Sequence, residues 1–441
     1  MLPIILQLRY KASTFKELAD RVSINVSNNT NERQQFYDLI YNKRFIPAGN
    51  TLLAGIDPIR PNCAILPSIT ENNFDELSKR AKILWTDRIG IGFDLSESLN
   101  PIQILEKLSV LNSNIKLGHR SQRGNMAVLN SSHPMIEDFI KIKTINRNLY
   151  NFNISVGFNT NLNSDLMDLM SENAWKNGDP GLVFLDRIQL NELDYLGKIK
   201  TLVPCGEQGM YDNEVCTLGS MNLNSFWINN TFNEKMFIDS VKLAVRFLDN
   251  VVDKMQINDK LLLEQLYNTR RIGLGIMGYA DVLDRLNIKY GSKNSLQLID
   301  YIGNLYKETS HQTSIDLASE KGICPIFKNT NIKRRNVTIT CIAPSGGISL
   351  LTNNKGFGIE PFFREANKLS LEDHLITQST WQKYVDNCIS KTINLSHTAT
   401  KSDIKNVWMY ARDNNLKSIT VYRDKCMTSQ PIDCVSGKCN L

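Results

Sequence analysis

The sequence predicts an α/β fold with a largely parallel sheet, formed as a single compact domain. The first observation is that short apolar runs alternate with stretches of helical periodicity along most of the chain. The second is composition, because 441 residues with 42% hydrophobic and 22% charged side chains are typical of a globular protein with a sizeable core. The third is that the sequence contains neither an internal repeat nor a low-complexity linker. A single domain is therefore favoured over the three small ones that length alone would allow.

Apolar spacing predicts the individual elements in chain order. Residues 1–45 form a polar helical segment, and Pro47 with Gly49 then breaks the pattern. Apolar runs predict strands at 63–67, 89–94, 126–129, 152–157, 336–341 and 418–422. Helical periodicity predicts helices at 74–85, 136–142, 233–256, 259–268 and 295–319.

Charge and cysteine content narrow the class of protein. The formal net charge is +6 and the basic residues are scattered, so no nucleic-acid partner is predicted. No apolar window reaches the roughly 18 residues that a membrane span needs, and the apolar N-terminal stretch is too short for a secretory signal. We therefore expect a cytoplasmic protein with no membrane partner. Its nine cysteines, an odd number over a long chain, are expected to be reduced.

The sequence gives little support to a dinucleotide-dependent enzyme, a metalloenzyme or a hydrolase. Residues 271–278 match the glycine spacing of a dinucleotide-binding turn, but a polar helical segment precedes them where a buried strand is required. We interpret these glycines as the place where a helix approaches a sheet. The five histidines show no ligand spacing, so no metal site is predicted. The sequence contains no Gly-x-Ser-x-Gly elbow, so this motif gives no support to a hydrolase.

The cysteines are the most informative residues. The run Pro204-Cys205-Gly206-Glu207 holds a thiol and a carboxylate two positions apart, and in an extended loop both would face one substrate. Cys216 follows eleven residues after this thiol, and Cys63 lies far upstream. Cys434 and Cys439 lie in a short polar tail, where a mobile pair can travel. An incidental surface pair or half of a zinc site is the alternative for the tail.

Several short runs occur together along the chain, namely Arg44-Phe-Ile-Pro-Ala-Gly, Asn62-Cys-Ala-Ile-Leu-Pro, Arg88-Ile-Gly-Ile-Gly-Phe, Arg123-Gly-Asn-Met-Ala-Val-Leu, Phe152-Asn-Ile-Ser-Val, Pro204-Cys-Gly-Glu, Cys216-Thr-Leu-Gly-Ser-Met-Asn-Leu, Arg271-Ile-Gly-Leu-Gly-Ile-Met-Gly and Ile342-Ala-Pro-Ser-Gly-Gly-Ile-Ser. In this order they resemble the catalytic subunit of ribonucleotide reductase. The resemblance implies a ten-stranded α/β barrel at residues 46–425, with a finger loop through its centre. The N-terminal helical segment, residues 1–45, precedes the barrel, and a mobile redox-active tail, residues 426–441, follows it.

The resemblance assigns a role to five thiols. Cys205, on the finger loop, is implied to carry the thiyl radical that takes the 3′ hydrogen of a ribonucleotide, expected to be a diphosphate. Cys63 and Cys216 are implied to supply two electrons as the 2′ hydroxyl leaves as water, and to become a disulfide. Cys434 and Cys439 are implied to re-reduce that disulfide by exchange, with thioredoxin or glutaredoxin resetting the tail.

The resemblance also implies groups that contact the substrate. Glu207 is the expected base for the 3′ hydroxyl. A glycine-rich turn is the expected phosphate site, since hydroxyls and backbone N–H groups suit an anion, and an ordinary loop is the alternative. The implied substrate-binding residues are Asn62, Pro344, Ser345, Gly346, Gly347, Ile348 and Ser349. A loop that links effector and base specificity is implied at Arg120, Arg123 and Gly124.

Three departures from the family pattern affect these expectations. Val203 replaces the asparagine that usually stands two residues before the radical cysteine, so its polar contact to the substrate is absent or supplied elsewhere. The stretch between Asp94 and Gly118 is shorter than usual, which leaves open whether a deoxynucleoside triphosphate effector and a homodimer are retained. Family-like sequence begins near Arg44, so we expect no ATP-sensing N-terminal domain.

The sequence is ambiguous about the radical source. Tyr422 stands where the oxygen-dependent class has paired tyrosines, and the C-terminal tail resembles that class. Residues 123–126 and 420–423 instead resemble the adenosylcobalamin-dependent class. We expect a radical borrowed from a separate ferritin-like dimetal (beta) subunit, with no cofactor tightly bound in this chain, and adenosylcobalamin is the alternative. An inactive regulatory homologue is disfavoured by the five retained cysteines. A glycyl-radical relative is disfavoured because the C-terminal region does not resemble its motif.

Overall fold

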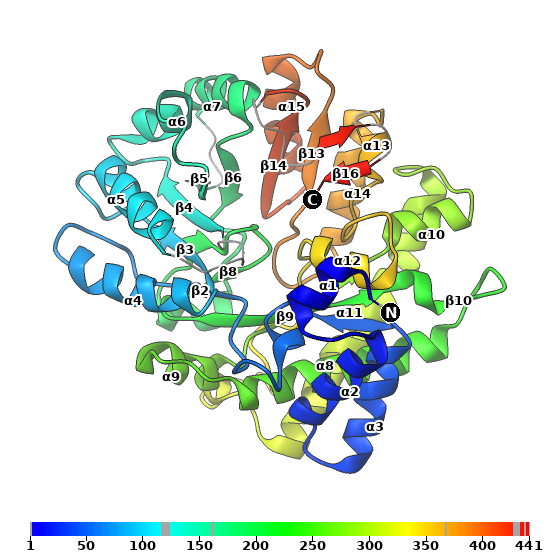
Figure 1. The fold of residues 1–441 in the computed structure, drawn as a ribbon. Helices are drawn as coiled ribbons and strands as arrows, with labels where there is room; N and C mark the ends of the chain where they lie inside the picture. The colour runs from blue at the N-terminus through cyan, green and yellow to red at the C-terminus, as the bar shows by residue number, and fades with distance from the viewer. Residues whose placement is uncertain are drawn as a thin grey trace.

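The computed structural model describes residues 2–115, 124–159, 163–366, 368–426, 433–435 and 438–440 (Figure 1). Ten strands form its main sheet, namely β1 (Phe45–Pro47), β2 (Cys63–Ile65), β3 (Gly90–Asp94), β4 (Asn125–Asn130), β5 (Phe152–Phe158), β6 (Gly181–Phe184), β9 (Val215–Asn222), β12 (Ile272–Met277), β13 (Thr392–Leu395) and β14 (Ser418–Arg423). Their order is β1-β9-β2-β3-β4-β5-β6-β14-β13, and β12 pairs with β9.

The first half of the sheet alternates strands with helices. Strands β2 to β6 pair in parallel, while β9 is antiparallel to β2 and β14 is antiparallel to β6. Four helices follow these strands in turn, and Figure 1 shows them on the outer side of the sheet. They are α4 (Phe74–Thr86), α5 (Pro101–Ser113), α6 (Ile136–Ile145) and α7 (Ser164–Asn177). Every residue of β3 is buried, as expected for a parallel strand covered on both faces.

The second half of the fold is built around β9 and β12. Its helices are α8 (Glu234–Lys254), α9 (Lys260–Thr269), α10 (Tyr279–Arg285), α11 (Lys293–Lys321), α12 (Gly346–Thr352), α13 (Phe363–Ala366), α14 (Leu371–Gln382) and α15 (Lys401–Asp413). Hydroxyl side chains cap α14 and α15, since Ser370 and Thr400 each form a capping box with an aspartate three residues on.

Two of the sequence-based interpretations are wrong. Residues 336–341 are predicted as a strand, but within this run only Thr340 forms a bridge, to Leu274 of β12, and the next residue, Ile342, bridges to Ile389 in the chain entering β13. Residues 271–278, interpreted as a helix approaching a sheet, contain β12 itself. A Cβ on Gly273 would lie 2.3 Å from the Gln208 side chain, so the glycines allow close packing inside the sheet.

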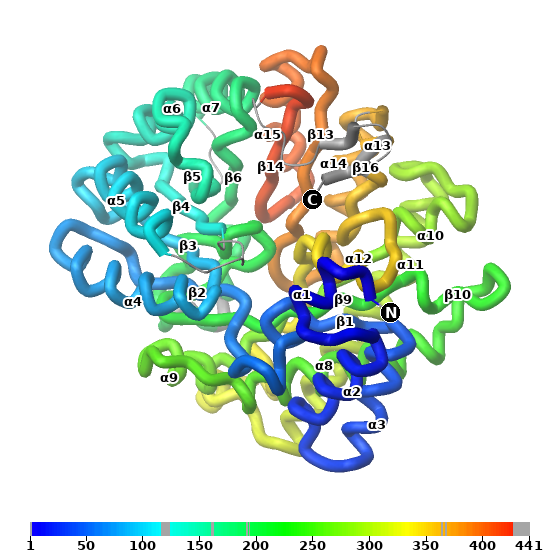
Figure 2. The backbone as a smooth tube through the Cα atoms, viewed as in Figure 1, coloured from blue at the N-terminus to red at the C-terminus, as the bar shows by residue number. Residues whose placement is uncertain are grey.

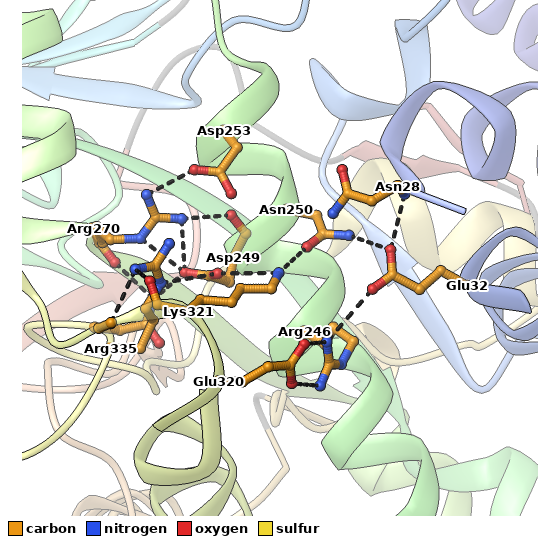
Figure 3. Close-up of polar contacts among 12 residues, drawn as sticks. Asn28, Glu32, Arg246, Asp249, Asn250, Asp253, Arg270, Glu320, Lys321 and Arg335 are labelled. Carbon is orange, nitrogen blue, oxygen red and sulfur yellow. Dashed lines mark hydrogen bonds and ion pairs between the residues drawn. The ribbon is translucent and has the colours of Figure 1, made fainter. Parts of the chain in front are cut away.

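The N-terminal helices are α1 (Ile4–Tyr10), α2 (Phe15–Val26) and α3 (Thr30–Tyr41). A polar network joins α3 to α8 of the main body (Figure 3). Glu32 of α3 accepts a hydrogen bond from the Asn250 amide of α8 at 2.9 Å. The neighbouring Asp249 is fully buried and pairs with Arg270 at 2.9 Å and Arg335 at 3.3 Å. Each buried charge therefore has an opposite charge or a hydrogen-bond partner beside it.

Three short two-stranded hairpins lie outside the main sheet in the described residues. The first, β7 (Thr201–Leu202) with β8 (Gly209–Met210), lies on the inner side of β3 and β4 (Figure 1). The others pair β10 (Trp227–Ile228) with β11 (Thr231–Phe232), and β15 (Asp433–Val435) with β16 (Lys438–Asn440). Figure 2 shows α1 beside α12. Within the described ranges, no helix combines the length and apolar character that a membrane crossing requires.

Candidate active site

The β7–β8 hairpin is the predicted finger loop, and it carries Cys205 at its tip. The backbone N–H of Gly206 donates to the Val203 carbonyl at 2.8 Å, which closes a β-turn around Cys205. Gly206 has φ +78°, the left-handed region that favours glycine. The turn leaves Cys205 exposed while Glu207 is buried. The loop is therefore not extended, and the two side chains do not share one face as the sequence-based argument expected.

Hydrogen bonds hold the hairpin on both sides of Cys205. The Asn153 side-chain amide donates to the Pro204 carbonyl at 2.8 Å. The Ser418 hydroxyl donates to the Gly206 carbonyl at 3.4 Å. The backbone N–H of Cys388 donates to the Glu207 carbonyl at 3.0 Å. The hairpin is thus fixed at residues 204, 206 and 207, to two strands of the sheet and to the segment leading into β13.

Two further contacts hold the base of the hairpin. The Asn387 side chain accepts from the Gly209 N–H at 2.9 Å and donates to the Gly209 carbonyl at 3.2 Å. On the β3 side, a Cβ on Gly92 would lie 2.1 Å from the Leu202 carbonyl oxygen, so the hairpin packs against bare backbone. The sequence reasoning missed these anchoring residues, because hydrogen bonds to main-chain atoms leave no characteristic spacing.

Glu207 is 2% exposed, and its Oε2 has no hydrogen-bond partner in the part of the chain that the structure describes. Burial raises the pKa of Glu207 to about 7, because the charged form loses its hydration. A carboxyl group with a pKa in this range can both accept and return a proton near neutral pH.

Cys63 and Cys216 lie directly opposite each other on the antiparallel strands β2 and β9. Opposed Cα atoms in such a pair are typically about 4.5–5.5 Å apart, which lies within the range that a disulfide spans. Both thiols are buried, in a small apolar cluster with Val203 of the finger loop. Val203 and the two cysteines thus share one small core beside the finger loop. Cys63 Sγ and the Pro204 ring also lie 3.4 and 2.9 Å from the position of a Cβ on Gly90.

A cavity of about 530 Å³ opens at the finger tip. Cys205, Tyr422, Pro344 and Asn153 all line it, although they come from four distant segments of the chain. Glu207, Cys63 and Cys216 are not among its lining residues. The cavity volume lies within the range of small-molecule sites.

Two lysine–carboxylate pairs also line this cavity, and the sequence reasoning did not identify them. Lys143 pairs with Asp179 at 2.5 Å, and Lys391 pairs with Glu360 at 3.2 Å. Lys391 also donates to Nδ1 of the buried His374 at 2.8 Å. Burial and the Lys391 charge lower the pKa of His374 to about 3, so this imidazole is neutral.

The predicted phosphate turn precedes and begins α12. The Ser345 and Ser349 hydroxyls lie 2.8 Å apart, and the Gly358 N–H donates to Ser345 Oγ at 2.6 Å. A Cβ atom added to Gly346 would have no neighbouring atom within 4 Å, so space is open there. A Cβ atom added to Gly347 would lie 3.2 Å from the Arg9 guanidinium of α1. Of the other predicted members, Pro344 is exposed and Ile348 is buried.

Asn62, predicted to bind substrate, accepts a hydrogen bond from the Leu218 N–H at 2.9 Å and so links β2 to β9. Arg120 and Arg123 lie outside the described residues. Gly124 is described, and its Cβ position would lie 3.6 Å from Pro204 of the finger loop.

Tyr422 of β14 lies in the cavity wall, and burial raises its pKa to about 12. In the C-terminal hairpin, Cys434 and Cys439 are partner positions of the β15–β16 ladder. Among the described residues, no group of three or more histidine, cysteine or acidic side chains could hold a metal ion.

Comparisons with known proteins identify the family and the fold. The family model described as "Ribonucleotide reductase, barrel domain" matches residues 158–340 and 358–422. A vitamin B12-dependent ribonucleoside-diphosphate reductase of Thermoplasma acidophilum is 29% identical, over 95% of this chain and 68% of the relative. A protein of the same name from Mycobacterium tuberculosis is 28% identical, over 88% of this chain and 72% of the relative.

A solved structure, the class Id ribonucleotide reductase alpha subunit of Actinobacillus ureae, shares the fold with a TM-score of 0.82. It is 18% identical, and the match covers 96% of each chain. The predicted α/β barrel with a finger loop is therefore confirmed. The family model spans more than half of the chain, and it covers the finger loop, β9, β12 and β14. The chain belongs to the ribonucleotide reductase family of enzymes, as a catalytic subunit.

Proposed function

We propose that the chain reduces ribonucleoside diphosphates to 2′-deoxyribonucleotides through a thiyl radical on Cys205. The thiyl takes the hydrogen atom from C3′ of the ribose, and the 2′ hydroxyl leaves as water. Two electrons and two protons come from the Cys63 and Cys216 thiols, which become a disulfide. Cys205 then returns its hydrogen atom to C3′, which regenerates the thiyl radical.

The observation that carries this proposal is the pairing of Cys63 with Cys216 beside the finger loop. These two residues are separated by more than 150 positions in the sequence, yet they are register partners on β2 and β9. Their cluster includes Val203, two residues before Cys205. The proposed two-electron donor, the pair Cys63 and Cys216, therefore lies on elements adjacent to the loop that carries the proposed one-electron oxidant, Cys205.

Glu207 is proposed as the base for the 3′ hydroxyl. The unpartnered Oε2 and the pKa of about 7 support this role, since such a group accepts a proton without being permanently charged. Because Glu207 does not line the cavity, a small rotation of the turn or a bridging water must connect it to the substrate.

The glycine-rich turn at residues 344–349 is proposed to bind the substrate phosphates, with Asn62 as a further substrate contact. Two facts support the turn, namely the presence of Pro344 in the wall shared with Cys205 and the open space at Gly346. The names of both relatives support a diphosphate substrate. Arg120, Arg123 and Gly124 are proposed to relate effector identity to substrate choice, and the position of Gly124 near Pro204 of the finger loop supports this role.

The tail is proposed to reset the active site. Cys434 and Cys439 would exchange with the Cys63–Cys216 disulfide, and thioredoxin or glutaredoxin would then reduce the tail. Their partner positions in the β15–β16 ladder support this role, since opposed antiparallel residues are at disulfide-forming separation.

For the radical source, we propose a separate dimetal subunit that acts through Tyr422. The location of Tyr422 in the same cavity wall as Cys205 supports a transfer between them. Adenosylcobalamin is the second candidate, and the names of two relatives favour it. When bound, that cofactor supplies a carbon-centred radical that can oxidise a thiol. The amide and hydroxyl groups of Asn177, Asn394 and Thr420 in the wall suit its amide-bearing periphery.

Adding each radical source in turn to the purified chain, with a ribonucleoside diphosphate and a dithiol, tests the proposal. We expect deoxynucleotide formation with a dimetal subunit. Turnover with adenosylcobalamin alone would contradict that preference and leave the thiyl reaction standing. A parallel assay with the triphosphate decides the substrate class. Failure with both sources and both substrates would contradict the function itself.

A further inference from the structure

Asn153 is the side chain of the sheet that reaches the finger loop next to Cys205. It is the second residue of β5, and it is exposed although the rest of that strand is buried. Its side chain lines the same cavity as Cys205. The hydrogen bond from Asn153 Nδ2 to the Pro204 carbonyl, at 2.8 Å, fixes the amide plane beside the reactive thiol.

The finger loop offers no polar side chain of its own at this point. Val203 is fully buried among apolar and thiol groups, Pro204 has no N–H, and Glu207 does not line the cavity. A hydrogen bond to a ligand next to Cys205 therefore comes from the surrounding wall. Asn153 is the wall residue bonded to the loop immediately before the thiol.

We propose that Asn153 binds a ribose hydroxyl of the substrate. This inference rests on the function proposed above, and it adds a binding residue to that site. One N–H of the Asn153 side chain is bonded to the Pro204 carbonyl. The side-chain oxygen Oδ1 and the second N–H bond to no other described residue. A hydroxyl group both donates and accepts, so one amide edge can satisfy it. The Pro204 carbonyl holds that edge at the thiol, where the reacting carbon of the sugar lies.

Binding can be measured without any radical source. Isothermal titration calorimetry on the full chain would compare a ribonucleoside diphosphate with its 2′-deoxy and 3′-deoxy analogues. Asn153→Ala should weaken ribonucleotide binding about tenfold, which is about 1.4 kcal/mol. It should leave the affinity unchanged for the one analogue that lacks the contacted hydroxyl. Because Asn153 is exposed, the variant is expected to fold, and its melting temperature verifies this.

Ser418→Ala is the matched control. It removes the hydrogen bond to the carbonyl on the other side of Cys205, yet Ser418 does not line the cavity. It should therefore leave the affinity for all three nucleotides unchanged. Equal weakening of all three by Asn153→Ala would overturn the proposal, since the residue would then act only through the position of the loop. Unchanged ribonucleotide affinity would overturn it as well. Failure of the wild-type chain to bind any ribonucleotide would instead contradict the proposed function.

Discussion

Replacing Glu207 with glutamine should change the pH dependence of stability. The free energy of unfolding of the variant, relative to that of the wild type, should increase from acidic to alkaline pH. The pKa of this carboxyl group rises from the usual 4.5 to about 7 because the side chain is buried without a partner for Oε2. In the unfolded chain the same group ionises near its usual value. Between these two values the folded protein binds more protons than the unfolded chain, so its stability falls as pH rises.

The size of the effect follows from the displacement of the pKa. A rise from 4.5 to about 7 corresponds to about 3 kcal/mol, since each unit of pKa is about 1.4 kcal/mol. Roughly 1 kcal/mol of this is already lost at pH 5, where most of the unfolded chain is ionised. The free energy of unfolding of Glu207→Gln, minus that of the wild type, should therefore increase by about 2–3 kcal/mol from pH 5 to pH 8.

Urea unfolding of both proteins at the two pH values measures this difference directly. Taking a difference between variants cancels the titration of every other group. Glu308→Gln on α11 is the control, because it makes the same substitution at an exposed side chain. An equal stability difference at pH 5 and pH 8 would refute the reasoning. It would mean that the Glu207 carboxyl group is hydrated, and its proposed role as a base near neutral pH would lose its physical support.

Three further predictions concern the rest of the structure. Asp249→Ala leaves its basic neighbours in the buried network without their shared counter-ion, and chemical denaturation should show a loss of about 3 kcal/mol or more. An unchanged midpoint would contradict the importance of the network. Gly92→Ala forces a methyl group onto the Leu202 carbonyl, so turnover should fall more than tenfold as the finger moves, and full activity would show that the hairpin adapts. The His374 imidazole should not titrate between pH 5 and 8 by NMR, while Lys391→Met should raise its pKa; titration in the wild type would contradict a neutral buried ring.

Local periodicity accounts for the elements that were predicted well. Helices α4, α8 and α11 each have a repeating apolar face, and their observed bounds differ from the predicted ones by one or two residues. The run 336–341 has the composition of a strand, but only Thr340 within it forms an isolated bridge, to Leu274. Strand β12 was missed because its glycines match a turn motif, and only the close packing at Gly273 explains them.

The candidate site was predictable to a different extent. Resemblance to a known family indicated the cysteines and Glu207, and the opposed positions of Cys63 and Cys216 follow from strand pairing that no local pattern encodes. The anchors Asn153 and Asn387 come from segments about 50 and 180 residues away from the finger loop, and they bind its main-chain atoms. Such contacts depend on the final packing of the strands, so the sequence carries no signal for them.

Formation of deoxynucleotide by the wild-type chain and by Cys205→Ser, under whichever radical source supports turnover, tests the central claim most directly. Serine retains the size and the fold of the exposed turn, but its O–H bond is too strong to form the hydrogen-abstracting radical. We predict measurable product from the wild type and none from Cys205→Ser, with nucleotide binding and stability unchanged in the variant. Product formation by Cys205→Ser at the wild-type rate would contradict the account.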